Sequence, residues 1–436
     1  MSLQDPVGPG PVVIGTPGLS LAVEAYGIGS RAGEEPTVVA RHGDRVIDLH
    51  RLHSEGLLDV GGGGGAFVFR SSSLNRFLAL GSSGWRAVDE QLSDVLLKGV
   101  PAEAMSSAAE VRMELPVEVA DFCDFYASEN HATNMGRILR PGTDPLPAAW
   151  RTIPLGYHGR AGTVVVSGTP IRRPTGVLSG PAGATGAGDG AGPVSGPTRR
   201  LDVEVELGYV IGTGSTQGVP VTVDNALDHV FGVVVLNDWS ARDIQAFEYQ
   251  PLGPFLGKSF ATSISPWVVP MRALAARRID GPDQGREVAQ HLTQSQPRAF
   301  DINLELSLNS NVLSRTNARF VNWSVEQFVA HLTSNGASMR TGDILATGTI
   351  SGTDEKSLGS LMELAWGGER PIALDDGQKR AWLEDGDTAT IRAWIDFEST
   401  ATDGSDSTKM CFPVGEVSGT IVPANTQPAN TQPANT

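Results

Sequence analysis

The stretch HVFGVVVLNDWSARDIQAFEYQ, residues 229–250, decides the fold because it passes from a purely apolar run to a dense group of polar side chains. Val233 to Leu236 form a β-branched and apolar run, which is typical of a strand buried on both faces. The run stops at Asn237 and Asp238. The sequence therefore predicts a mainly β domain in which a buried strand delivers Asp238 to its end.

The second half of this stretch has the spacing of a helix. If a helix starts near 239–240, Arg242, Gln245 and Tyr249 lie at i, i+3 and i+7 and share one face. That face would lie close to the strand end that carries Asp238. The same pattern also fits a helix N-terminus with an acidic cap and a solvated face, so both interpretations stay open.

Upstream, the stretch LDVEVELG, residues 201–208, alternates apolar side chains with the carboxylates of Asp202, Glu204 and Glu206. A strand would place these carboxylates on one face about 7 Å apart. A solvated face explains this pattern, because any half-exposed strand alternates in this way. A hard-cation site explains it too, since Ca²⁺ and Mg²⁺ bind carboxylate oxygens and relieve the repulsion.

Two further segments carry polar groups that the pattern alone does not explain. The segment DFCDFYASENHATNMGRILR, residues 121–140, holds Asp124 and His131 with too little apolar periodicity for a core helix, so it fits a surface loop as well as a site. The loop YQPLGPFLGKSFATSISPW, residues 249–267, carries Lys258 without an acidic partner nearby in the sequence. A surface lysine is the alternative to a functional one.

Composition excludes several classes of protein. The chain has 436 residues, of which 40% are hydrophobic, so it is long enough for two domains and a sizeable core. It has no run near the roughly 18 to 20 apolar residues of a membrane span, and its first residues, MSLQDPVGPG, do not resemble a secretory signal, so we expect a cytoplasmic protein without a membrane partner. The formal charge of −16 argues against nucleic-acid binding and favours a small-molecule partner.

The two cysteines, Cys123 and Cys411, lie far apart in the sequence. They give neither a disulfide framework nor the paired thiols of a zinc site. We therefore expect oxygen or imidazole ligands for any metal.

Changes in composition and hydrophobic pattern along the chain predict its domain organisation. Residues 1–116 read as strands and loops with one helical pattern at 85–99, and 117–422 read as a large mainly β domain with function on its loops. Residues 176–197 are rich in glycine and alanine and predict a flexible loop. The PANTQ repeat of 423–436 has no apolar face, so we expect a disordered tail.

Several motifs together resemble the fumarylacetoacetate hydrolase family. They are DFYASENHATN (124–134), IPLGYHGRAGTVVVSGTPIRRPTG (153–176), LDVEVELG (201–208), NDWSARDIQAFEYQPLGPFLGKSFATSISPWVVP (237–270) and LATGTISGTDEKSLGSLMEL (345–364). The motifs DFY, GYHGR and GTISG resemble the fumarylacetoacetases of this family more than its shorter hydratases and decarboxylases. The resemblance implies a small N-terminal SH3-like β-barrel and a large C-terminal mixed β-sandwich and β-roll. It also implies a homodimer with each active site near the subunit interface.

The activity implied by the resemblance is metal-dependent hydrolysis of a carbon–carbon bond of 4-fumarylacetoacetate to fumarate and acetoacetate, the last step of tyrosine and phenylalanine degradation. Two alternatives remain: a hydrolase or decarboxylase of a related acylpyruvate or 1,3-diketo acid, and a catalytically silent metal-binding scaffold. Breaking a carbon–carbon bond between carbonyls needs a base that activates water, a role that histidine suits near pH 7. It also needs cations and hydrogen-bond donors where negative charge develops.

The resemblance also assigns roles to residues of this chain. The implied ligands of Ca²⁺ or Mg²⁺ are Asp124, Glu204, Glu206 and Asp238, with Lys258 and Thr262 near a second cation. The implied catalytic residues are His131 as general base, Glu363 as its orienting carboxylate, and Lys258, Arg242 and Gln245 as charge-stabilising groups. The implied substrate contacts are Tyr126, Arg140, Tyr157, Gln245, Tyr249 and Thr349.

The chain departs from the family pattern in two places. Ala261 follows GKSF where a glycine is usual, which adds a Cβ in a tight loop beside the implied second-cation contacts. Glu129 adds a negative charge near His131. His158 is expected to position Tyr157 without a catalytic role. Six histidines share no spacing and are expected to be structural or exposed: His42, His50, His53, His229, His291 and His331.

Overall fold

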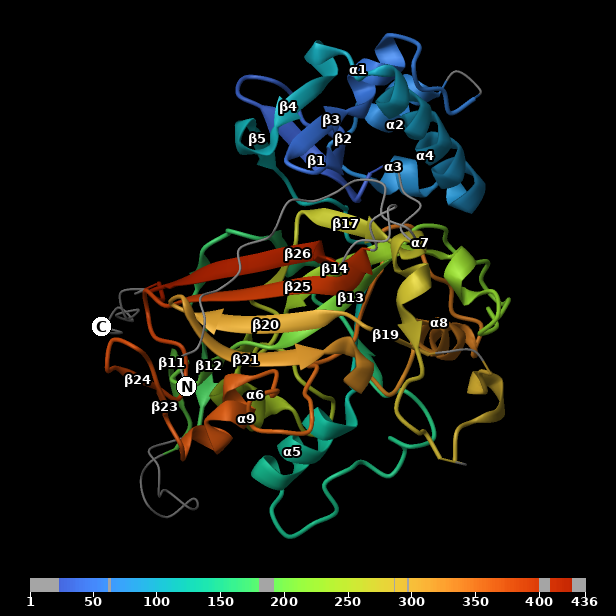
Figure 1. The fold of residues 1–436 in the computed structure, drawn as a ribbon. Helices are drawn as coiled ribbons and strands as arrows, with labels where there is room; N and C mark the ends of the chain where they lie inside the picture. Colours follow the sequence, from blue (N-terminus) through green and yellow to red (C-terminus); the bar gives the residue numbers. More distant parts are fainter. Residues whose placement is uncertain are drawn as a thin grey trace, which may run out of the picture.

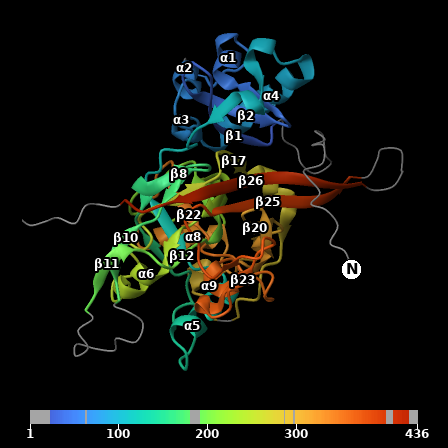
Figure 2. The same cartoon turned by 90° about the vertical axis from the view of Figure 1, so that its left-hand side faces the viewer.

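The computed structural model describes residues 23–61, 64–179, 192–285, 287–295, 298–399 and 408–425. These residues form a mainly β protein with two mixed sheets, as the sequence predicts (Figure 1). The N-terminal region, blue in the figure, lies at one end of the molecule, and helices α5, α6 and α9 lie at the other (Figures 1 and 2).

The larger sheet has thirteen strands among the described residues, and most follow one path in the order β4-β3-β2-β1-β17-β14-β13-β22-β6-β7. Strand β5 pairs with β1, and β16 pairs with β14 and β8. The bounds are β1 (Ala25–Arg31), β2 (Thr37–His42), β3 (Arg45–Asp48), β4 (Met105–Ser107), β5 (Val111–Met113), β6 (Phe122–Phe125), β7 (Gly156–His158), β8 (Val164–Val166), β13 (Val205–Ile211), β14 (Val230–Asn237), β16 (Thr262–Ile264), β17 (Trp267–Pro270) and β22 (Ile344–Ala346).

The second sheet has five strands in the order β21-β20-β25-β26-β9 and covers one face of β14. Its strands are β9 (Ile171–Arg172), β20 (Asn303–Leu308), β21 (Asn311–Asn317), β25 (Thr388–Ser399) and β26 (Thr408–Val422). Four strand pairs stand apart: β10 (Thr175–Leu178) with β11 (Val194–Pro197), β12 (Leu201–Asp202) with β15 (Ser240–Ala241), β18 (Arg278–Ile279) with β19 (Ala299–Phe300), and β23 (Ile372–Ala373) with β24 (Lys379–Arg380).

Strand β14 is buried on both faces, which confirms the interpretation of its apolar run. Val233 and Val235 pack into the core shared with the five-stranded sheet. Val234 and Leu236 pack into a second core, which they share with the N-terminal region. The central strand therefore joins the two cores, and its C-terminal end holds Asp238 in a fixed place.

The helices show where periodicity was and was not informative. The helical pattern at 85–99 is confirmed by α4, and β1 to β5 confirm the expected strands before 116, but the short helices α1, α2 and α3 were not predicted. These helices are too short to give a clear period, and packing decides them; α1 buries Leu49 and Leu52. The bounds are α1 (Leu49–Ser54), α2 (Gly65–Phe69), α3 (Asn75–Leu78), α4 (Gly81–Lys98), α5 (Glu129–Leu139), α6 (Arg242–Glu248), α7 (Met271–Leu274), α8 (Val325–Thr333) and α9 (Leu361–Leu364).

The N-terminal strands join the large sheet through β1. Tyr26 of β1 lies opposite Val268 of β17, so strands from the two regions share hydrogen bonds. Among the described residues, β4 ends the strand path and has no pairing with β5, so no closed barrel is seen. The N-terminal region and the large domain thus share both a sheet and a core.

The two ends of the glycine-rich segment 176–197, for which the sequence predicts a loop, are strands. They belong to β10 and β11, which pair antiparallel with Thr175 opposite Pro197. The intervening residues 180–191 lie outside the described residues, and so do 426–436 of the PANTQ tail. A hairpin therefore replaces the ends of the predicted loop.

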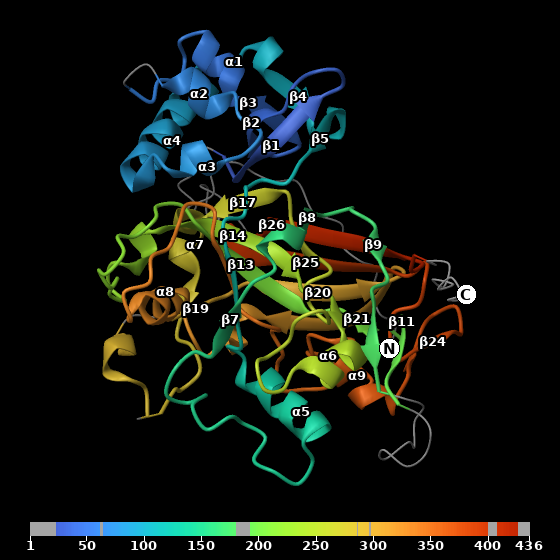
Figure 3. The same ribbon diagram turned by 180° about the vertical axis from the view of Figure 1, so that it is seen from behind.

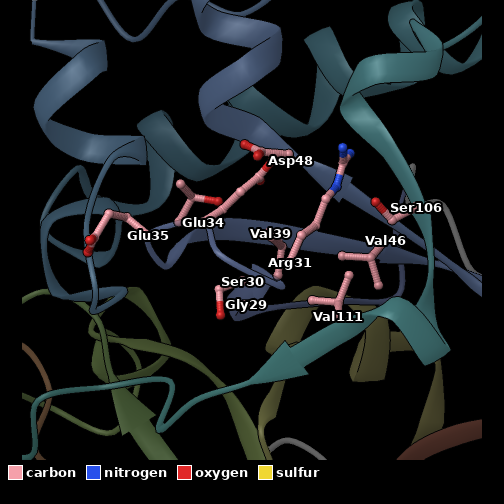
Figure 4. A pocket seen from close by; sticks show the side chains of 11 residues that line it. Gly29, Ser30, Arg31, Glu34, Glu35, Val39, Val46, Asp48, Ser106 and Val111 are labelled. Carbon is pink, nitrogen blue, oxygen red and sulfur yellow. The ribbon is translucent and has the colours of Figure 1, made fainter.

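A small hollow lies within the N-terminal region, between β1, β2 and β3 (Figure 4). Its lining includes Ser30, Arg31, Glu34 and Asp48. Arg51 on α1 pairs with Glu34 across 2.6 Å and with Asp48 across 3.3 Å, so these carboxylates are already compensated. No helix in the described part of the chain is long and apolar enough to cross a membrane.

Candidate active site

Three carboxylates converge where neighbouring strands of the large sheet run side by side. Asp124 lies on β6, Glu206 lies on β13 and Asp238 directly follows β14. One carboxylate oxygen from each lies within 4.8 Å of the others, and all three residues are buried. The sheet order, with β22 between β6 and β13 and β14 beside β13, explains how segments far apart in the sequence meet.

Three of the six carboxylate oxygens in this cluster lack a protein donor. Both Glu206 carboxylate oxygens and Asp124 Oδ1 are buried without a hydrogen-bond partner. Burial, together with the neighbouring negative charges, raises the pKa of Asp124 to about 7 and the pKa of Glu206 well above its usual range. Buried oxygens without partners are unfavourable in a protein interior, and hard divalent cations bind such oxygens. The three residues therefore fit a divalent cation.

Arg160 compensates part of the charge, and sequence reasoning assigned it no role. Its Nη1 donates to both oxygens of Asp238 at 2.7 and 2.8 Å, and its Nη2 donates to Asp124 Oδ2 at 2.9 Å. The guanidinium lies over the rings of Phe122 and Tyr157. The signal was present, because Arg160 ends the motif GYHGR, but nothing in the sequence pointed to its partners.

Lys258 is buried against two carboxylates, so the surface-lysine alternative was wrong. It is 3% exposed, and its Nζ donates to Asp238 Oδ2 at 2.6 Å and to Glu204 Oε2. Burial alone would lower the pKa of Lys258, but the negative charges of Asp238 and Glu204 raise it. Thr262 donates to Asp238 Oδ1 at 3.3 Å from the first position of β16. Lys258 and Thr262 thus meet Asp238, as the motif implied.

Glu204 lies between two cations. Arg242 Nη2 donates to Glu204 Oε1 at 2.6 Å, and Lys258 binds the other oxygen. Burial would raise the pKa of Glu204, but the charges of Arg242 and Lys258 hold it below its usual range. In contrast to Glu206, Glu204 has both oxygens satisfied by the protein, and its role as a cation ligand stays a prediction.

The single regular strand predicted over 201–208 is interrupted. Asp202 ends β12, Glu206 lies on β13, and Glu204 lies in the break between them. All three are buried, so the solvated-face interpretation was wrong. The apolar neighbours Val203 and Val205 are buried too, in the core shared with the five-stranded sheet.

The helix predicted after Asp238 begins slightly later than expected, at Arg242, after the short strand β15. Arg242 and Gln245 share a face as the spacing predicts, and Arg242 Nη1 donates to Gln245 Oε1 at 3.3 Å. Arg242 is 6% exposed and its Nε donates to Asp202 Oδ2 at 2.8 Å. The solvated-helix alternative therefore fails for Arg242.

The carboxylates of this region outnumber its cations. Its cations are Arg160, Arg242 and Lys258. Its carboxylates are Asp124, Asp202, Glu204, Glu206 and Asp238. With every group ionised, two negative charges remain without compensation. A divalent cation would neutralise them.

His131 and Glu363 form a second centre beside this cluster. His131 lies in α5, and its Nδ1 is 2.8 Å from Glu363 Oε2. Ser360, whose hydroxyl donates to Glu363 Oε2 at 2.9 Å, forms a β-bridge with Glu204, so the two centres are neighbours. The segment is a helix with His131, Ala132, Met135 and Gly136 buried, which corrects the surface-loop interpretation.

Glu363 is held by donors on both oxygens. Oε2 accepts from Ser351 Oγ at 2.8 Å and Ser360 Oγ at 2.9 Å besides His131, and Oε1 accepts from Asn134 at 2.9 Å. Burial would raise the pKa of Glu363, but His131 and these hydrogen bonds lower it. A carboxylate at Nδ1 favours the tautomer with the proton on Nδ1, which leaves Nε2 able to accept one.

The remaining implied substrate contacts differ in how closely they approach the two centres. Tyr157 donates to Asp124 Oδ2 at 2.8 Å, and the Tyr126 ring meets the His131 ring edge-on at 5.5 Å between centroids. Thr349 is buried, and its hydroxyl lacks a protein partner. Arg140 donates instead to the Pro145 carbonyl at 3.1 Å.

Tyr249 follows α6 directly, and its hydroxyl accepts from Gln250 at 2.9 Å. Within the described part of the chain, no hydrogen bond or ion pair joins Tyr249 to the carboxylates. Its role as a substrate contact, like that of Arg140, stays a prediction.

The two departures from the family pattern are accommodated locally. Glu129 pairs with Arg151 at 2.6 Å, so its charge is compensated outside the His131–Glu363 centre. Ala261 is buried in the core between Lys258 and β16. His158 is bound to Asp121 at 2.8 Å and its side chain is 58% exposed, so it lies on the outer side of β7.

Comparison with known proteins identifies the family. Residues 25–121 match the model "Fumarylacetoacetase N-terminal", and residues 121–408 match "Fumarylacetoacetate (FAA) hydrolase C-terminal". The chain is 39% identical over 418 residues to a fumarylacetoacetase of Rattus norvegicus, covering 92% of this chain and 95% of that protein. It is 41% identical over 378 residues to fumarylacetoacetase fahA of Aspergillus fumigatus, covering 82% and 84% of the two chains.

Solved structures show the same fold. A fumarylacetoacetate hydrolase of Exiguobacterium antarcticum aligns with a TM-score of 0.52 at 16% identity, over 92% of this chain and all of that one. A putative HpcE protein of Mycobacterium smegmatis aligns with a TM-score of 0.51 at 18% identity, with the same coverage. Because both family models match in order and the relatives align over most of their length, the chain belongs to the fumarylacetoacetate hydrolase family.

Proposed function

We propose that the chain is a fumarylacetoacetase, which uses water to break a carbon–carbon bond of 4-fumarylacetoacetate and releases fumarate and acetoacetate. The observation that carries the proposal is the pairing of His131 with Glu363 beside a cluster of three buried carboxylates, in a chain that aligns with fumarylacetoacetases almost from end to end. The reaction would complete tyrosine and phenylalanine degradation, and we propose a cytoplasmic location.

The first step is activation of water by His131. Its Nδ1 proton is held by Glu363, so Nε2 accepts a proton from water as the water attacks a carbonyl carbon of the substrate. The resulting imidazolium is stabilised by the buried Glu363 carboxylate. The same proton then moves to the carbon that leaves. This general-base contribution is worth roughly 10² to 10⁴ in rate.

Negative charge develops on the attacked carbonyl oxygen and then on the departing enolate. Arg242 and Lys258 are buried cations whose positions are fixed by Asp202, Glu204 and Asp238. Fixed charges in a site of low dielectric need little reorganisation when the charge appears, so they lower the barrier. Gln245, bound to Arg242, supplies a further amide near these oxygens.

A divalent cation completes the site in this proposal. Asp124, Glu206 and Asp238 would bind it, with Glu204 as the fourth ligand, and Ca²⁺ and Mg²⁺ are the proposed ions because all the ligands are oxygens. Bound there, the cation supplies Lewis-acid polarisation of substrate oxygens. Lys258 and Thr262 lie against Asp238, where a second cation is proposed.

We also propose that the protein is a homodimer. Directly before Lys258, the residues after α6 expose large apolar side chains: Phe255 is 67% exposed and Leu252 is 95% exposed. Exposed apolar groups beside an active site favour burial against a partner, and a second copy of the chain is the proposed partner.

The proposed N-terminal domain is 1–116, with an SH3-like barrel, and the proposed catalytic domain is 117–422.

Turnover of fumarylacetoacetate by the purified protein tests the function. The conjugated diketone absorbs ultraviolet light, and this absorbance disappears when the bond is broken. We expect loss of absorbance with fumarate and acetoacetate formed in equal amounts. Turnover of acylpyruvates or other 1,3-diketo acids with little turnover of fumarylacetoacetate would replace this proposal with the related hydrolase or decarboxylase.

A further inference from the structure

Asp202 is a fully buried carboxylate that the proposed mechanism does not use directly. Its two oxygens accept four hydrogen bonds. Oδ1 accepts from the backbone N–H groups of Val203 and Leu361, both at 2.8 Å. Oδ2 accepts from Arg242 Nε at 2.8 Å and from the Met362 N–H at 3.2 Å.

These bonds connect the two halves of the site. On one side, the Arg242 guanidinium continues to Glu204 Oε1 at 2.6 Å, beside Lys258. On the other side, Leu361 and Met362 begin α9, which carries Glu363 in its first turn. One carboxylate thus holds both the cation expected to face the substrate oxygens and the segment that orients the base.

The chain around Asp202 reinforces this connection. Ser360, which caps α9, forms a β-bridge with Glu204, and the Val205 N–H donates to the Gly359 carbonyl at 2.9 Å. The backbone fixes the segments 202–205 and 359–363 against each other, and the side chain of Asp202 extends this link to Arg242. Because a guanidinium is planar and donates in fixed directions, a bond at Nε sets where Nη1 and Nη2 point.

We propose that Asp202 is a positioning residue, which sets the Arg242 guanidinium and the Glu363 carboxylate in the geometry that the reaction needs. Asp202 acts through these two residues and does not touch substrate. A displacement of about 1 Å in a catalytic group can cost on the order of 10²-fold in rate. This inference rests on the proposed hydrolysis, so its test includes a readout that does not depend on turnover.

The test variant is Asp202→Asn. Asparagine keeps the size of the side chain and one acceptor oxygen, but its NH₂ group cannot accept from Arg242 or Met362. We expect kcat to fall about 10- to 100-fold with a smaller change in KM. In an Arg242→Gln background, the same change should cost only a few-fold, because residues that act through one another are not additive.

A matched control comes from a buried aspartate elsewhere. Asp387 is 3% exposed, and its Oδ2 accepts from Arg380 Nε at 2.9 Å and from the Glu384 N–H at 2.7 Å. Asp387→Asn therefore removes the same types of bond with none to the two centres. We expect it to lower the melting temperature and to keep kcat within about twofold. An equal loss of kcat in Asp202→Asn and Asp387→Asn would show that Asp202 has only a structural role.

Amide hydrogen exchange provides the readout without turnover. In Asp202→Asn we expect exchange in a peptide covering 359–364 to become at least tenfold faster, with no such change in Asp387→Asn. If the wild type does not hydrolyse fumarylacetoacetate, the proposed function is wrong, but the exchange measurement still tests whether Asp202 positions the segment 359–364. Should Asp202→Asn not fold, Asp202→Ala removes both acceptor oxygens without placing a donor against Arg242. Unchanged exchange in 359–364, or fully additive kcat losses with Arg242→Gln, would overturn the proposal.

Discussion

Glu363 and Glu206 are both fully buried carboxylates, yet the protein treats them in opposite ways. Glu363 accepts four hydrogen bonds, and its pKa is lowered by His131 and by those bonds, although burial alone would raise it. Glu206 accepts none, and burial together with Asp124 and Asp238 raises its pKa well above the usual range. Glu363 lies on α9 and Glu206 lies on β13, two elements that are labelled in the view from behind (Figure 3).

The difference separates what the chain completes by itself from what it leaves for a ligand. The His131–Glu363 centre is assembled from side chains alone, so its geometry should persist without metal. The Asp124–Glu206–Asp238 cluster has a surplus of negative charge and oxygens without donors, and it needs a cation to be favourable. Variants of the two centres should therefore fail in different ways.

The largest expected effect is on the complete centre. His131→Ala should lower kcat by about 10² to 10⁴, because the base is lost while the cation and Arg242 still bind substrate. Stopped-flow turnover and substrate-analogue binding would be measured on the folded variant. His158→Gln is the matched control, because His158 also binds a carboxylate, Asp121, but on the exposed side of β7. More than a tenth of wild-type kcat in His131→Ala would remove His131 as the base.

The second prediction sets Glu206→Gln against Glu204→Gln in protein freed of metal by chelation. Glu206→Gln removes a buried carboxylate without partners, so the metal-free variant should melt no lower than metal-free wild type. Glu204→Gln leaves Lys258 and Arg242 without their shared carboxylate, and losing one partner of a buried ion pair costs about 3 to 5 kcal/mol. Thermal melting in chelator would show this ordering, and the reverse ordering contradicts it.

The third prediction concerns pH. Burial and the charge of Asp238 raise the pKa of Asp124 to about 7, above its ordinary value of 3.8. The fold therefore favours the protonated form, and the stability that Asp124 contributes is complete below pH about 4 and is lost as the pH rises through about 7. A cation binds the ionised form instead. The melting-temperature gap between cation-saturated and chelated protein should widen from pH 5 to 7.5, and a gap independent of pH would contradict this account.

The smallest expected effect comes from one of the donors to Glu363. Ser360→Ala removes the hydroxyl that donates to Glu363 Oε2, while His131 and Ser351 still donate to the same oxygen. A single hydrogen bond contributes about 1 kcal/mol, so kcat should fall only about threefold to tenfold. Steady-state kinetics on Ser360→Ala would measure this. A loss as large as that of His131→Ala would mean that the centre is less completely held than its contacts indicate.

Strand β14, which precedes Asp238, could be predicted because a strand buried on both faces has a continuous apolar run in its sequence. The run Val233–Leu236 predicted β14 and the position of Asp238, and the spacing of Arg242 and Gln245 predicted a shared helix face. The residues of the two centres were found by motif, since Asp124, Glu206 and Asp238 come from distant segments that periodicity cannot bring together.

What the sequence could not supply were the partners of these residues. Arg160 and Asp202 were not assigned, because their roles arise from hydrogen bonds between segments 36 to 160 residues apart. The interruption between β12 and β13 was missed for a related reason. Alternation predicted one regular strand, whereas Glu204 bridges to Ser360, a residue from a distant segment of the sequence.

Calorimetric titration of the metal-free protein with Ca²⁺ or Mg²⁺ tests the contrast between the two centres most directly. The account predicts saturable binding in the wild type, binding of similar affinity in His131→Ala, and binding weakened at least tenfold in Glu206→Gln. Wild-type affinity in Glu206→Gln, or loss of cation binding in a folded His131→Ala protein, would contradict the division of the site into a complete centre and one that requires a cation.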